Sequence, residues 1–207
     1  LFPYPRDDAM AKKPTELSLF LRRWVAHPLR VGAVLPSSPS LCRMVARNTV
    51  RGPDDRVMEL GAGTGTVTDY LIAAGLPEDR LILVELDPDY VAYLRQRFPK
   101  ATVVEGDASR PRSLLDPELV GKLDTVISGI PALQFPLAKQ RAYMDECFSI
   151  LREGGQVLQY TYSLKSPLPY EKLQMTGRRL GLTLANVPPA HLWCYLRPQA
   201  GLAAAAE

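Results

Sequence analysis

The hydrophobic and polar positions of the N-terminal part of the chain predict two helices. Between residues 16 and 27, apolar side chains recur with the spacing of one helix face, and Pro28 ends the element. The apolar face consists of Leu17, Phe20, Leu21, Trp24 and Val25. Residues 30–38 are rich in Gly, Pro and Ser, which predicts a loop. A second helix is predicted from Ser38-Pro39, a capping residue followed by proline at the first helical position.

From residue 56 onward, short apolar runs alternate with helical stretches. Because the runs are continuously apolar, they are typical of parallel strands that are covered on both faces. Strands are predicted at 56–60, 81–85, 102–105, 123–128 and 156–161, with helices at 66–74, 88–98, 111–115 and 137–151 between them. A last helix is predicted at 170–180, followed by two closing strands at 182–187 and 192–197.

This alternation predicts an α/β fold, a seven-stranded doubly wound (Rossmann-like) sheet over residues 55–198. Residues 16–54 would form N-terminal helices and a loop that close a ligand site on this sheet. Residues 1–15 are expected to be disordered or foreign to the native chain, and the alanine-rich tail 199–207 is expected to be disordered.

Three glycines follow the first predicted strand and open a helix: Gly61, Gly63 and Gly65. Without side chains they allow a sharp turn and a close approach of a ligand to the backbone. Their spacing is G-x-G-x-G, whereas dinucleotide-binding proteins carry G-x-G-x-x-G. Glu59 precedes the first glycine by two residues, where its charge would repel a pyrophosphate but would suit a sulfonium with a free amino group. The run 59–65, which includes Ala62 and Thr64, therefore predicts S-adenosylmethionine as the cofactor.

The carboxyl ends of the next three strands carry further candidates, and ligands of doubly wound sheets bind at such ends. Glu85, followed by Leu86, can accept hydrogen bonds from both ribose hydroxyls. The stretch Gly106-Asp107-Ala108 follows the third strand and is placed to meet the adenine amino group. Ser128-Gly129 follows the fourth strand, next to the expected position of the methyl group.

Composition and charge narrow the class of protein. Apolar residues make up 46% of the 207, which is typical of a folded domain. The three cysteines (Cys42, Cys147 and Cys194) lie far apart without metal-ligand spacing, so reduced thiols and no metal site are predicted. No apolar run reaches the roughly 20 residues that span a bilayer, and residues 1–13 lack a signal-peptide core, which predicts a cytoplasmic protein. The net charge of +3 is too small to indicate nucleic acid, but residues 1–56 hold ten Lys and Arg against five Asp and Glu, a balance that favours anionic surfaces.

The strand-end pattern resembles the seven-stranded class I methyltransferases over about residues 55–197. This resemblance implies that Glu59, Gly61, Gly63, Glu85, Asp107 and Ser128 contact S-adenosylmethionine, with S-adenosylhomocysteine as the product. The segment 30–38, including Ser37 and Ser38, occupies the place of the cofactor-closing motif of the rRNA adenine dimethylases. Those enzymes carry an N-x-P-Y/F motif after the fourth strand, where this chain has Ser128-Gly129-Ile130-Pro131-Ala132. Ala132 replaces the aromatic that stacks on the base, and the C-terminal RNA-binding domain is absent from the sequence, so no nucleic-acid partner is expected.

The chain looks more like the bacterial phospholipid N-methyltransferases of the peripheral membrane type. The matching stretches are 20–24, 32–38, 128–131, 159–162 and 186–190. The resemblance implies stepwise methylation of phosphatidylethanolamine towards phosphatidylcholine, or of a related aminolipid. Helix 16–27, with Phe20, Trp24 and flanking arginines, would lie in the membrane interface at the inner face of the plasma membrane, although the same helix could simply pack on the domain.

Methylation of an amine requires the neutral nitrogen, so a proton must leave the substrate. His27 and His191 are the two histidines, and each could serve as the base, bind a lipid phosphate, or have only a structural role. Tyr160 and Tyr162 end the fifth strand and could surround a quaternary ammonium, and one of the two is expected to enter the site while the other lies in the core. The further candidates for binding the substrate are Tyr170, Arg22, Arg23 and Arg30, of which the arginines could equally be solvated surface charges.

Three functions fit these features. The first is methylation of a lipid amine, the second is methylation of an RNA adenine or a small amine, and the third is membrane binding without turnover. The sequence does not indicate the number of methyl groups transferred, the choice between ethanolamine and ornithine lipids, or the oligomeric state.

Overall fold

The computed structural model of the 207-residue chain describes residues 37–163, 166–186 and 188–197. These residues belong to one compact unit, Val34–Glu207. The predicted helix 16–27 and the candidates Arg22, Arg23, His27 and Arg30 lie outside the described residues, as do both predicted terminal segments. The predictions that fall on these segments stay predictions.

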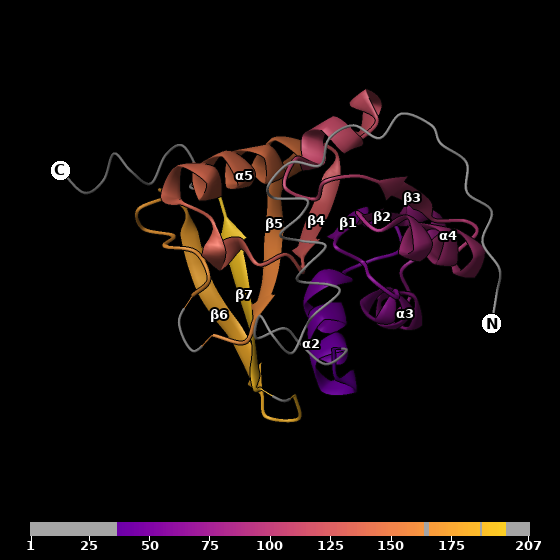
Figure 1. The fold of residues 1–207 in the computed structure, drawn as a ribbon, viewed down its shortest axis with the longest axis horizontal. Coiled ribbons are helices and arrows are strands. Elements are labelled where there is room, and N and C mark those ends of the chain that lie inside the picture. Colours follow the sequence, from indigo (N-terminus) through magenta and orange to yellow (C-terminus); the bar gives the residue numbers. More distant parts are fainter. Residues whose placement is uncertain (1–36, 164–165, 187, 198–207) are drawn as a thin grey trace. The chain divides into compact units, whose positions relative to one another are not determined.

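Seven strands form one sheet in the order β3-β2-β1-β4-β5-β7-β6, which runs from right to left in Figure 1. The strands β1 to β5 are parallel, and β7 is antiparallel to both of its neighbours. Their bounds are β1 Val57–Leu60, β2 Leu81–Glu85, β3 Thr102–Glu105, β4 Leu123–Ser128, β5 Leu151–Thr161, β6 Thr176–Thr183 and β7 Ala190–Leu196. The predicted α/β doubly wound sheet is confirmed.

Burial explains why the central strands show no alternation of apolar and polar residues. Every residue of β1, β2 and β4 is buried, whereas β3 at the sheet edge has two exposed end residues and two half-buried middle residues. A strand that is covered on both faces gains from an apolar side chain at every position, so the period-two pattern disappears.

The long helices are α2 Pro39–Thr49, α3 Thr66–Ala73, α4 Pro88–Arg97 and α5 Leu137–Ile150. Short 3₁₀ turns η1 to η4 occupy Glu78–Arg80, Pro111–Leu114, Pro117–Leu119 and Ala132–Gln134. As predicted, Ser38 caps α2, where its side chain accepts from the amide of Leu41. The strand order reverses between β1 and β4, so right-handed crossovers place α3 and α4 on one face of the sheet and α5 on the other.

The predicted helix 170–180 is wrong. Residues 170–175 form a turn, and the chain then enters β6, which pairs with β7 along its whole length. Pairing with β7 decides this segment, and Gly177 inside the predicted helix also disfavours a helix. A side chain on Gly177 would also stand 2.5 Å from the ring of Tyr170. The predicted strand 182–187 therefore lies too late in the sequence, and the segment predicted as helix 111–115 is the 3₁₀ turn η2.

Within the described ranges, no helix is both long and apolar enough to cross a membrane. The three cysteines are buried and free, and no cluster of metal-ligating side chains occurs among the residues that the structure describes.

Candidate active site

The glycine run forms a tight turn between β1 and α3. Gly61, Gly63 and Gly65 have φ angles of 78°, 56° and 75°, a left-handed region that other residues enter at a cost. The amides of Gly61 and Ala62 donate to the carbonyl of Val84 at 2.9 and 3.1 Å, which fixes the turn to β2. Around Gly63 there is open space, since an added Cβ would meet nothing within 4 Å. The loop thus exposes backbone at the carboxyl edge of the sheet.

Glu85 holds this loop from the end of β2. Its Oε2 accepts from the amide of Gly63 at 2.8 Å, and its Oε1 accepts from the amides of Leu86 and Asp87 at 2.7 and 3.0 Å. The side chain is buried. An ionised carboxylate has about four acceptor positions, so a ribose hydroxyl can still donate to it. This leaves room for one ribose hydroxyl, whereas the sequence predicted contacts to both.

Glu59 lies beneath the loop with 2% of its surface exposed. Burial raises the pKa of its carboxyl to about 8, a shift that Thr68 opposes by donating its hydroxyl at 2.7 Å. The charges of Glu85 and Asp69 raise this pKa further. A cationic ligand nearby would favour the ionised form, so the acidic floor suits a sulfonium with an ammonium group.

The third strand end forms a second turn beside Glu85. The amide of Gly106 donates to the carbonyl of Glu85 at 2.9 Å, and Asp107 Oδ1 accepts from the amide of Ser109 at 2.9 Å. Ala108 is buried, and a side chain on Gly106 would stand 2.5 Å from Leu114. The predicted adenine-binding stretch is therefore packed closely against the rest of the site.

The carboxyl end of β4 contacts both of its neighbouring strands, β1 and β5. The amide of Gly129 donates to the carbonyl of Leu60 at 3.0 Å, and a Cβ on Gly129 would overlap the hydroxyl of Tyr160. Tyr160 therefore reaches the turn after β4. Ser128 is turned the other way, towards α5, where its hydroxyl accepts from Tyr143 at 2.8 Å in a fully buried contact.

Ser37 and Ser38 are held beside the two tyrosines. The amide of Ser38 donates to Asn186 Oδ1 at 2.8 Å, and Asn186 is buried. Burial raises the pKa of both tyrosine hydroxyls, that of Tyr162 to about 12, while Ser37 lowers both. Sequence reasoning gave Asn186 no role, because its partner lies 148 residues away.

Tyr160 and Tyr162 lie on one face of the chain, so the strand itself does not direct one tyrosine to the site and the other to the core. Residues two apart in an extended chain lie on the same face. Tyr160 and Tyr162 both pack on the core cluster that contains Leu41 and Cys42 of α2, and both lie near Ser37. The structure therefore brings both hydroxyls to the α2 side of the carboxyl edge.

The opposite face of β5 and β7 carries the other candidates. His191, at the start of β7, pairs with Thr161 and is 2% exposed, and neither ring nitrogen has a partner among the described residues. Burial lowers its pKa, with the charge of Arg179 as the second cause, so the ring is neutral near pH 7. Tyr170 lies further from the edge, with its ring centroid 6.3 Å from that of Trp193.

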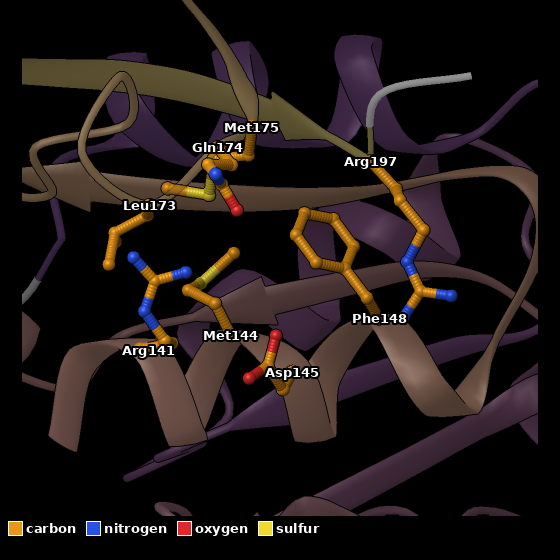
Figure 2. A pocket seen from close by; sticks show the side chains of 8 residues that line it. All are labelled: Arg141, Met144, Asp145, Phe148, Leu173, Gln174, Met175 and Arg197. Carbon is orange, nitrogen blue, oxygen red and sulfur yellow. The ribbon is translucent and has the colours of Figure 1, made fainter. Parts of the chain in front are cut away.

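A pocket of about 150 Å³ lies outside this constellation, between α5, the turn before β6 and the end of β7. Figure 2 shows its lining side chains, none of which is a predicted site residue. They are Arg141, Met144, Asp145, Phe148, Leu173, Gln174, Met175 and Arg197. Because β7 is antiparallel to β5, Arg197 lies towards the edge opposite the glycine loop.

The strand order, the glycine turn and the acidic strand ends define a class I S-adenosylmethionine-dependent methyltransferase. A sequence profile described as "Methyltransferase domain" matches residues 57–155. An ornithine lipid N-methyltransferase of Singulisphaera acidiphila is 35% identical over 146 residues, which are 69% of this chain and 76% of that protein. The chain therefore belongs to the methyltransferase family, and the predicted cofactor is confirmed.

Other similar proteins agree on the fold and differ in substrate. A ribosomal RNA small subunit methyltransferase A of Synechococcus elongatus is 37% identical over 126 residues, and the chain spans 41% of its length. The structure of a Burkholderia thailandensis 1,6-didemethyltoxoflavin-N1-methyltransferase with bound S-adenosylhomocysteine has a TM-score of 0.61 at 18% identity, covering 93% of this chain and 94% of that one. A Thermotoga maritima O-methyltransferase has a TM-score of 0.56 at 13% identity, covering 84% of this chain and 71% of its own.

Proposed function

We propose that this methyltransferase transfers methyl groups to the amine headgroup of a membrane lipid, phosphatidylethanolamine stepwise towards phosphatidylcholine. The observation that carries the proposal is the 35% identity to an ornithine lipid N-methyltransferase, which extends over 76% of that protein. Ornithine and ethanolamine headgroups both present a primary amine on a lipid. The proposed chemistry is the same for both, whereas the rest of the headgroup differs.

The arrangement of residues supports this chemistry. S-adenosylmethionine, when bound, supplies an electrophilic methyl group on a sulfonium. The protein then has to bind a neutral amine beside Gly129 and take up the proton that the nitrogen loses. We propose His191 as the first acceptor of this proton, since it is neutral and neither ring nitrogen has a partner within the described part of the chain. Tyr160 and Tyr162 would face the methylated product, whose cationic headgroup suits aromatic rings.

Membrane association is part of the same proposal. The predicted amphipathic helix 16–27 would hold the protein peripherally on anionic lipid at the inner face of the plasma membrane. Co-sedimentation with phosphatidylglycerol vesicles tests this for the double variant Phe20→Ser with Trp24→Ser. Equal binding of the variant and the unchanged protein would show that the anchor lies elsewhere.

Lipid mass spectrometry tests the function itself. In a bacterial host that lacks phosphatidylcholine, expression should produce mono-, di- and trimethylated phosphatidylethanolamine, and the variant Glu85→Gln should produce none. A radiolabelled methyl-transfer assay then compares vesicles of phosphatidylethanolamine, vesicles of ornithine lipid, and ribosomal RNA. Label in ornithine lipid alone would show that the substrate is ornithine lipid and not phosphatidylethanolamine. Label in RNA alone would overturn the proposal and favour the activity of the RNA methyltransferase relatives.

A further inference from the structure

Two buried glutamines hold one turn of the chain next to the proposed methyl position. Gln159 of β5 donates its Nε2 to the carbonyl of Ile130 at 2.8 Å. Gln140 of α5 donates its Nε2 to the carbonyl of Ala132 at 3.2 Å, with that of Leu133 at 3.5 Å. The two side chains are 1% and 6% exposed. Both side-chain amides therefore bind the loop that follows Ser128-Gly129.

These hydrogen bonds fix which way each amide points. A carbonyl can only accept, so each glutamine must direct its NH₂ group at the loop and its Oε1 away from it. Both Oε1 atoms are buried, and neither has a donor among the residues that the structure describes. Buried acceptors in native proteins nearly always have a donor, so two in one place point to a donor that comes from outside the chain.

The position of the pair agrees with this reading. Gln159 lies opposite Ser128 in the register of β4 and β5, so the two side chains share the face towards α5. The loop that both glutamines hold begins one residue after Gly129, which contacts β1 through the carbonyl of Leu60. A donor bound to the pair would thus lie beside the strand end where the methyl group is expected.

We propose that Gln140 and Gln159 form the binding site for the methyl-accepting amine and that their two oxygens receive its two N–H groups. A neutral primary amine has two N–H donors and one lone pair. With both donors bound to the glutamines, the lone pair is left to attack. The N–CH₃ bond forms as the S–CH₃ bond breaks, the electron pair stays on sulfur, and the nitrogen then releases a proton to His191 and on to water.

This inference rests on the proposed function and makes it more specific. Each methylation replaces one N–H group, so the neutral secondary amine offers one donor and the neutral tertiary amine offers none. The glutamines should therefore contribute most to the first methylation and least to the third. A residue that only supports the fold would affect all three steps alike.

The test compares Gln159→Met and Gln140→Met on three substrates. The specificity constant kcat/KM is measured in phosphatidylglycerol vesicles with phosphatidylethanolamine, its monomethyl derivative and its dimethyl derivative. Because each variant removes one acceptor, we expect a loss on the order of tenfold to a hundredfold for the unmethylated lipid. The loss should be smaller for the monomethyl lipid and less than about threefold for the dimethyl lipid.

Gln156→Met is the matched control. Gln156 is a buried glutamine of the same strand, but both ends of its amide have partners, with Nε2 donating to the carbonyl of Asn48 at 2.7 Å and Oε1 accepting from Cys194 at 3.5 Å. Its loss should lower all three constants by the same factor. The same uniform pattern for Gln159→Met and Gln140→Met would overturn the inference and indicate that an internal water satisfies the two oxygens.

Cofactor binding and activity on other amines distinguish a failure of this inference from misfolding of a variant and from a failure of the proposed function. Calorimetric binding of S-adenosylmethionine shows which variants are folded, and Gln140→Met carries the test if Gln159→Met does not bind the cofactor. If the unchanged protein methylates none of the three lipids, the proposed function fails. The glutamines are then tested on the primary, secondary and tertiary forms of whichever amine it does methylate, and a uniform loss there overturns the inference separately.

Discussion

The carboxyl edge of the sheet is built in two different ways on either side of the point where the strand order reverses. On the β1-β2-β3 side, the acidic side chains have donors within the chain: Glu59 has Thr68, Glu85 has three amides, and Asp107 has Ser109. On the β4-β5-β7 side, buried polar atoms of Gln140, Gln159, His191 and Trp193 have no partner among the described residues. Every such atom in the described ranges lies on this second side.

The difference matches what the two sides are proposed to bind. The cofactor is the same in every turnover, so a rigid site that is already formed saves the cost of ordering it at each binding event. An amine headgroup changes at every methylation, and its N–H donors are consumed as it reacts. Acceptors that depend on the substrate for their donors can distinguish these forms, because a missing donor leaves a buried acceptor unsatisfied.

Removing the carboxylate of Glu85 should have the largest effect, because several hydrogen bonds of the β1-β2-β3 side end on this one group. Glu85→Ala leaves three backbone amides without their acceptor and removes the proposed ribose contact. We expect S-adenosylmethionine to bind roughly a hundredfold more weakly, as for the loss of hydrogen bonds to a charged group worth about 3 kcal/mol. Calorimetry measures the change.

Glu105→Ala is the control for that variant. Glu105 lies beside Glu85 in the register of β2 and β3, but its side chain is exposed. Its loss should change the affinity by less than about twofold, as is usual for an exposed polar side chain. Equal affinities for Glu85→Ala and the unchanged protein would refute the ribose contact.

Gly129 and Tyr160 are in close contact on the β4-β5-β7 side, where the amide of Gly129 also donates to β1, and a methyl group on Gly129 should disturb this packing. In Gly129→Ala, the new Cβ would overlap Tyr160 Oη and stand 3.0 Å from its Cζ. We expect a loss of about 1–3 kcal/mol in the free energy of unfolding, as for other overpacked sites. Urea denaturation measures it, together with methyl-transfer activity.

Tyr160→Phe tests the cause of that loss. Removing the hydroxyl takes away the closest contact, so the cost of Gly129→Ala should be clearly smaller in the Tyr160→Phe background. Additive costs in this double-mutant cycle would show that the two residues do not oppose each other. The backbone near Gly61 would then have to carry the strain, since its carbonyl is 3.4 Å from the added Cβ.

The cofactor side could be predicted from the sequence because its residues are neighbours along the chain. The glycine turn occupies seven consecutive residues, and Glu85 and Asp107 each directly end or follow an apolar strand. Local spacing therefore determined both the strand ends and the cofactor. The hydrogen bond between Glu85 and the amide of Gly63 is the exception, since it spans 22 residues and needs β1 and β2 to be paired.

The substrate side depends on contacts that no local pattern records. Gln140 and Gln159 lie in different elements and meet only because both bind the carbonyls of one loop. The wrong helix at 170–180 has a similar origin, since pairing with β7 decides that segment. An unremarkable glutamine in an apolar strand offers one usable signal, because a buried amide needs partners for both of its ends.

A smaller effect is expected where Asn186, in the segment after β6, binds Ser38 at the start of α2. Asn186→Ala leaves the partly buried amide of Ser38 without its acceptor. We expect a loss of about 1–2 kcal/mol in the free energy of unfolding and weaker binding of S-adenosylmethionine. Asn186→Asp keeps an acceptor oxygen and should recover much of the stability.

Asn48→Ala serves as the control, since that side chain donates only to Met44 within α2. If Asn186→Ala lowers the free energy of unfolding no more than the control does, Ser37 and Ser38 are not part of the cofactor site.

The smallest effect concerns the carboxyl group of Glu59, whose pKa is raised by burial. The folded pKa of Glu59 is about 8, against 4.5 as its ordinary value, with burial as the main cause. Because the folded chain holds this proton more tightly, the free energy of unfolding should fall as pH rises from about 4.5 to 8. Cofactor binding should run the opposite way, because a cation favours the ionised carboxylate.

The affinity for S-adenosylmethionine should therefore increase by roughly three- to tenfold between pH 6 and pH 8.5, which corresponds to a shift of up to about one pKa unit on binding. Glu59→Gln removes the titrating group and keeps an acceptor for Thr68, so both pH slopes should flatten in calorimetry and in urea denaturation. The cofactor's own amino group titrates identically in both proteins and cancels in the comparison. Parallel pH profiles for the variant and the unchanged protein would mean that Glu59 supports the glycine turn without interacting with the charge of the cofactor. The β1-β2-β3 side would then recognise its ligand by shape and hydrogen bonds alone.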